Sequence, residues 1–111
     1  MIVELENRKY TVKANGSFMK KYQETFNENM MIALYKCSQE KDVYTCAKLT
    51  YCAINEEMPF DEWIDSFETP LFMLASMDKI LEYLIRSVEP TVKAENNATE
   101  EEGDTPKKKE N

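Results

Sequence analysis

The sequence has no histidine and only two glycines among its 111 residues. Without histidine the chain lacks the commonest general base, the commonest group that titrates near neutral pH, and a usual zinc ligand. Two glycines are few for the tight turns of an all-β sandwich or barrel, so helices are expected. No GxSxG, HExxH, GxGxxG or Walker motif occurs either. These absences predict a protein that is not an enzyme and that needs no cofactor or metal.

Basic charge is also in short supply, because 14 Lys and Arg face 21 Asp and Glu, for a net charge of -7. Proteins that bind nucleic acid generally use Lys and Arg to neutralise phosphates, so no nucleic-acid partner is expected. Residues 69–77 form a charge-free stretch, far shorter than the roughly 18 to 20 apolar residues of a membrane span. A charge at Glu4 interrupts the start of the chain, which argues against a signal peptide. The sequence predicts a cytoplasmic protein without a membrane partner.

The three cysteines, Cys37, Cys46 and Cys52, are an odd number at irregular spacing and contain no CxxC pair. Free cysteines usually pack as small apolar side chains. We therefore expect reduced thiols in the core.

Asp61 and Asp65 stand one helical turn apart, a spacing that two interpretations fit. They could form a hard-cation site, but an EF-hand loop needs ligands at alternate positions and a glycine turn, and neither is present. The favoured interpretation is a solvated acidic face of a helix.

The composition changes abruptly at residue 89. Residues 89–111 contain no aromatic side chain, and their only apolar ones are Val92, Ala94 and Ala98. Such a segment buries too little surface to offset the conformational entropy of about 1 to 2 kcal/mol that each ordered residue loses. The sequence predicts a folded domain over residues 1–88 and a disordered charged tail over residues 89–111.

Apolar and polar residues alternate near the N-terminus, with Val3 and Leu5 in one run and Tyr10 and Val12 in the next. This period of two predicts a β-hairpin with its turn within residues 6–9. A lone hairpin is marginal in water, so its apolar face should lie against the helices that follow.

The remaining pattern is helical, with apolar residues recurring every three or four positions. Asn15 and Asp42 are suited to cap helices, and Pro59 and Thr69-Pro70 mark further helix starts. The stripes predict helices over residues 18–26, 30–37, 43–54 and 60–67 and a last helix that reaches Val88. The apolar face of the helix predicted over residues 43–54 is wide enough for a helix at the centre of the domain. The predicted fold is mainly α with a small N-terminal β-hairpin (α+β).

Methionine and aromatic residues supply the candidate partner-binding side chains. The chain has seven methionines, and methionine-rich surfaces can adapt to partners. The candidates are Met30, Met31, Leu34, Tyr35 and Trp63. Core packing is the favoured interpretation of the methionines and of Trp63, and contact with a partner is the alternative.

Four segments occur in an order that resembles a known family: the hairpin Ile2–Val12, the Phe18-Met19-x-x-Tyr22 motif, the helix Cys46–Ala53 and the segment Met58–Ile64. This order is similar to that of the tail assembly chaperones of long-tailed phages and prophages of Gram-positive bacteria. The resemblance covers roughly residues 1–88 and includes the long last helix and the charged tail.

The resemblance implies a non-catalytic protein that coats the helical tape-measure protein and helps tail-tube subunits polymerise around it. Expected partners are the tape-measure protein, the tail-tube protein and further copies of the chain. It would act in the host cytoplasm and be missing from the mature virion. Lys107, Lys108 and Lys109 are compatible with an adenine run on which ribosomes could shift frame. The alternative is a small acidic phage-encoded regulator or inhibitor that binds a host protein, and gene neighbourhood would separate the two.

Overall fold

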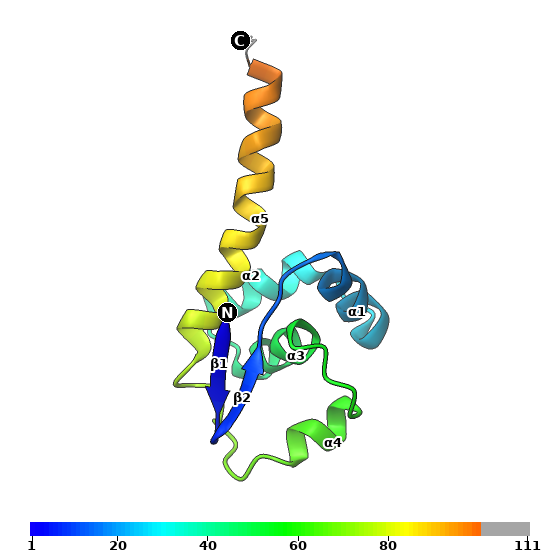
Figure 1. The fold of residues 1–111 in the computed structure, drawn as a ribbon, viewed down its shortest axis with the longest axis vertical. Coiled ribbons are helices and arrows are strands. Elements are labelled where there is room, and N and C mark those ends of the chain that lie inside the picture. The colour runs from blue at the N-terminus through cyan, green and yellow to red at the C-terminus, as the bar shows by residue number, and fades with distance from the viewer. Residues whose placement is uncertain (101–111) are drawn as a thin grey trace.

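The computed structural model describes the backbone of residues 1–100 and the side chains of residues 1–88. Two strands are followed by five helices in this part of the chain (Figure 1). The elements are β1 (Ile2–Leu5), β2 (Arg8–Thr11), α1 (Gly16–Phe26), α2 (Met30–Glu40), α3 (Val43–Ala53), α4 (Phe60–Asp65) and α5 (Met77–Glu100). The mainly helical fold with an N-terminal hairpin confirms the predicted fold class.

The hairpin has a shorter turn than the sequence predicted. Leu5 pairs with Arg8, so the turn consists of Glu6 and Asn7 alone, and Arg8 already belongs to β2. Both turn residues have positive φ, 50° and 70°, as a two-residue turn of the hairpin type requires. Val3 and Leu5 are buried against the helices, as expected for a two-stranded sheet that needs support.

Helix α3 is the centre of the domain. Its N-cap is Asp42, whose carboxylate accepts hydrogen bonds from the backbone N–H of Thr45 at 3.2 Å and from the Thr45 hydroxyl at 2.9 Å. Every side chain from Thr45 to Ala53 is buried, and α1, α2, α4 and α5 all pack against this helix. The predicted central helix is therefore confirmed.

One cation lies within this buried helix. The Lys48 side chain is 11% exposed, and its Nζ lies 2.9 Å from Oε1 of Glu28, which is 46% exposed. The same carboxylate oxygen accepts a hydrogen bond from the Tyr22 hydroxyl at 2.8 Å. The hydrogen bond from Lys48, and then that from Tyr22, lower the pKa of Glu28. The network ties α1 and the α1–α2 loop to α3 and leaves the buried ammonium group paired.

The last helix begins later than predicted. Thr69-Pro70 was expected to start it, but residues 70–76 form successive turns, and α5 begins at Met77. The prediction was wrong because Thr69 does not cap a helix: its backbone N–H and its hydroxyl donate to the carboxylate of Glu6 in the hairpin turn. A tertiary contact therefore replaces the local helix signal.

The last helix also ends later than predicted. Its backbone continues past Val88 to Glu100, and this part projects away from the other elements (Figure 1). The change in composition at residue 89 coincides with the departure of the helix from the domain rather than with its end. Residues 91–100 contain helix-favouring Ala, Lys and Glu and no glycine. The rest of the predicted tail, residues 101–111 with Lys107, Lys108 and Lys109, lies outside the described residues.

Candidate functional site

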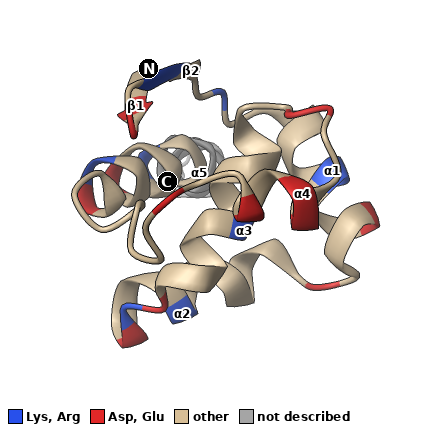
Figure 2. Ribbon diagram, turned by 90° about the horizontal axis from the view of Figure 1, so that it is seen from below, with Lys and Arg blue, Asp and Glu red and all other residues tan. Residues whose placement is uncertain are grey.

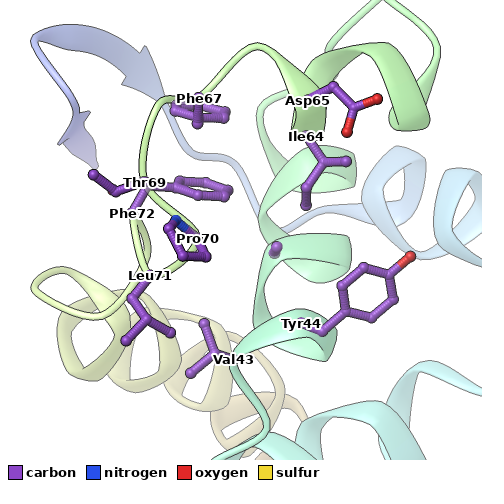
Figure 3. A pocket seen from close by; sticks show the side chains of 10 residues that line it. Val43, Tyr44, Ile64, Asp65, Phe67, Thr69, Pro70, Leu71 and Phe72 are labelled. Carbon is purple, nitrogen blue, oxygen red and sulfur yellow. The ribbon is translucent and has the colours of Figure 1, made fainter.

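A pocket of about 510 Å³ opens between the N-terminal half of α3, α4 and the segment that links α4 to α5. We call it the Tyr44–Leu71 pocket after the two exposed side chains at its margins. Its lining is mostly apolar and consists of Val43, Tyr44, Ala47, Ile64, Asp65, Phe67, Thr69, Pro70, Leu71 and Phe72. Figure 3 shows Ile64 extending from α4 toward the space between Pro70 and Tyr44. Asp65 is the single charged side chain in this lining.

The two sides of the pocket expose large apolar surface. Tyr44 of α3 is 57% exposed and Leu71 of the linking segment is 56% exposed. Scattered exposed apolar side chains are ordinary, but two of them that border a concave apolar lining make this pocket a candidate binding surface. The arrangement suits the apolar side chains of a partner.

The segment that links α4 to α5 forms one wall of the pocket and packs against the hairpin through Arg8. The rings of Phe67 and Phe72 are parallel, with centroids 3.8 Å apart. The guanidinium of Arg8 lies 4.1 Å from the centroid of Phe67, and it donates hydrogen bonds to the Oγ and the carbonyl oxygen of Ser66. The Arg8 side chain thus holds one ring of the pocket from the strand side.

Glu6 fixes the same wall at a second point. Its carboxylate accepts hydrogen bonds from the backbone N–H groups of Glu68 and Thr69, both at 2.9 Å, and from the Thr69 hydroxyl at 2.7 Å. The bond from Glu68 is the largest cause that lowers the pKa of Glu6 below its ordinary value of 4.5. The hairpin turn therefore positions a segment that has no regular secondary structure.

We expect Glu6→Gln to lower the melting temperature at neutral pH. The glutamine NH₂ group would face N–H or O–H donors whose hydrogen bonds the carboxylate accepts in the parent protein. Since the pKa of Glu6 is lower in the folded state, its contribution is present above pH 4.5 and is lost as pH falls through the folded pKa. The melting temperatures of the two proteins should therefore converge as the pH falls through the folded pKa of Glu6.

Glu4→Gln, at an exposed position of the adjoining strand β1, is the matched control for this pH series. A difference between the parent and Glu6→Gln that stays constant from pH 7 to pH 3, or that Glu4→Gln reproduces, would contradict the role given to Glu6.

An aromatic cluster underlies the pocket, and Trp63 is at its centre. Trp63 is 1% exposed, and its indole N–H donates to the Tyr10 hydroxyl at 3.4 Å. Its ring contacts those of five neighbours, with centroid separations from 5.0 to 6.3 Å: Tyr10, Tyr51, Phe60, Phe67 and Phe72. The cluster fixes α4 and the pocket wall on the buried side of α3.

The candidate partner-binding residues from the sequence do not form one surface: some are buried in the core and others are exposed on α2. Trp63 and Leu34 are buried at 1% and 5% exposure, so their side chains belong to the core and not to a partner surface. Met30 is half-buried against the core. Met31 and Tyr35 are 54% and 62% exposed and lie one turn apart on α2. These two, with the exposed Ile32, form a second apolar surface that we call the α2 surface.

Sequence reasoning missed the pocket itself. Tyr44 lies in the helix predicted over residues 43–54 but was not among its apolar positions, and Leu71 and Phe72 fell at the predicted start of the last helix. The charge-free run that contains them was the available signal. Their meeting depends on contacts that Glu6 and Arg8 make across the chain.

The three cysteines lie in the core, where the sequence placed them. A hydrogen bond with Cys46, together with burial, raises the pKa of Cys37, and burial raises the pKa of Cys52 to about 12. Both thiols therefore stay protonated at neutral pH, the form that is a poor nucleophile. Among the described residues, no group of three or more acidic, histidine or cysteine side chains could hold a metal ion.

No helix among the described residues is both long enough and apolar enough to cross a membrane. Comparisons of the chain with protein-family models, with characterised proteins and with solved structures find no match.

Proposed function

We propose that this protein is a phage tail assembly chaperone that binds the helical tape-measure protein through the Tyr44–Leu71 pocket, without catalysis. The observation that carries the proposal is the pocket: a mostly apolar lining of about 510 Å³ between exposed Tyr44 and Leu71 on a small helical domain. Amphipathic helices bind in apolar grooves by inserting side chains spaced three or four residues apart. A long helical client offers many such sets.

The resemblance of residues 1–88 to tail assembly chaperones gives the proposal its client. A tape-measure protein would expose apolar helix faces until tail-tube subunits surround it, and a small binding domain present in many copies could cover them. We further propose that the protein acts in the host cytoplasm, contacts the tail-tube protein during assembly and stays out of the mature virion.

Co-expression with the tape-measure protein of the same genome tests the proposal. We expect the tape-measure protein to move from the insoluble to the soluble fraction and to co-purify with more than one copy of this chain per tape-measure chain, in buffer that contains a chelator. Burial of apolar faces should let the complex persist near 0.5 M salt, where the screening length is only about 4 Å.

A regulator or inhibitor that binds a host protein would behave differently in the same experiment. If the tape-measure protein stays insoluble and no complex is recovered even at low salt, the chaperone proposal fails. A gene that lies away from those for the major tail protein and the tape-measure protein would count against it as well.

A further inference from the structure

We propose that the Tyr44–Leu71 pocket selects amphipathic helices in which Lys or Arg flanks the apolar anchor residues. This inference rests on the proposed function for the identity of the client, and it adds the chemistry by which the client segment is chosen. The geometry that points to it is the position, along one side of an apolar pocket, of a stretch of chain whose only charged residues are acidic.

The stretch is defined by its sequence. From Leu49 to Asp78 inclusive, the chain has seven acidic residues and no Lys or Arg. This stretch contains α4 and the whole linking segment, which together supply seven of the ten lining residues. One side of the pocket is therefore built from chain that carries negative charge alone.

Two carboxylates are well placed to meet a bound helix. Asp65 lines the pocket, and Asp61 precedes it by one turn on the same side of α4. Both side chains are exposed, and α4 stands out as an acidic element when the molecule is viewed along its long axis (Figure 2). Neither carboxylate forms a salt bridge with any of the described residues.

Two cations that contact lining residues of the pocket are already engaged. Lys48 is buried beneath Tyr44 and paired with Glu28. Arg8 is bonded to Ser66 and stacked on Phe67. The carboxylates of α4 are thus available to a partner, and complementary charge would favour a basic one over an acidic one.

The expected energies of ion pairs and apolar contacts assign a different role to each in the interface. An exposed ion pair is worth about 0.2 to 1 kcal/mol, so two of them change affinity by roughly two- to thirtyfold and are reduced by salt. The apolar contacts must therefore supply most of the affinity, while the carboxylates of α4 choose among helices with similar apolar faces.

Two synthetic peptides test the inference against the full chain. Both are 18-residue amphipathic helices with the same leucine face; one carries Lys and the other Glu beside that face. By fluorescence anisotropy in 50 mM salt, we expect the Lys peptide to bind at least tenfold more tightly. The double variant Asp61→Asn/Asp65→Asn should weaken binding of the Lys peptide by three- to tenfold and leave that of the Glu peptide unchanged or improved.

The matched control is Glu4→Gln/Glu24→Gln, which removes the same charge from exposed positions on β1 and α1. It should bind the Lys peptide as the parent does. Equal binding of the two peptides by the parent, no binding of either, or an equal loss in the control would overturn the inference.

The same proteins separate this inference from the proposed function. If the tape-measure protein co-purifies but the two peptides bind equally, the charge selection is wrong and the chaperone proposal stands. If the Lys peptide is selected as expected but the tape-measure protein is never bound, the selection holds and the client is wrong.

Discussion

Replacing Trp63 by alanine is expected to lower the free energy of unfolding by about 3 to 5 kcal/mol, the range for removing a large buried aromatic side chain. Trp63 is 1% exposed and contacts rings from β2, α3, α4 and the linking segment. Its loss would leave a cavity that several elements border, and it would remove the donor to the Tyr10 hydroxyl. Small domains are stable by only about 5 to 15 kcal/mol, so the variant should be close to unfolding.

Urea denaturation followed by circular dichroism measures the effect. Tyr35→Ala is the control, because this aromatic side chain is 62% exposed and its removal should change stability by less than about 0.5 kcal/mol. If Trp63→Ala unfolds at the same urea concentration as the parent, the aromatic cluster does not hold α4 in place. A milder replacement, Trp63→Phe, should be less destabilising than alanine, which keeps the comparison measurable if the alanine variant does not fold.

Local signals predicted those elements whose structure is decided locally. Asn15 and Asp42 accept hydrogen bonds from the first turns of α1 and α3, as their sequence positions indicated. The alternation that places Val3 and Leu5 on one face predicted the hairpin correctly, because that face is buried. In each case a short stretch of sequence contains both the signal and its partner.

The linking segment could not be predicted in that way. Thr69-Pro70 is a good helix start on its own, but Glu6, more than sixty residues earlier, binds the donors of Thr69. Phe67 and Phe72 then stack on each other beneath Arg8 rather than lying along a helix. This wall of the pocket depends on these long-range contacts, so helical periodicity could not predict where Leu71 and Phe72 lie.

The two apolar surfaces make different predictions about the client. We expect Leu71→Asp to weaken binding of the tape-measure protein by at least thirtyfold, a loss of about 2 kcal/mol or more, because a buried interface anchor is replaced by a charge beside Asp65. Leu71 is 56% exposed, so the domain itself should remain folded. Affinity is measured by titrating labelled tape-measure segments with each variant, after circular dichroism has shown that the variant is folded.

Tyr35→Asp on the α2 surface is the matched control, since Tyr35 is 62% exposed and the same charge is introduced. It should bind the tape-measure protein within about threefold of the parent, because a surface change outside the interface removes no contact. The reverse result, a large loss with Tyr35→Asp and none with Leu71→Asp, would move the client to the α2 surface, where the sequence first suggested Met31 and Tyr35. A comparable loss with both would mean that the client helix spans both surfaces, and the pocket would then not be the sole docking site.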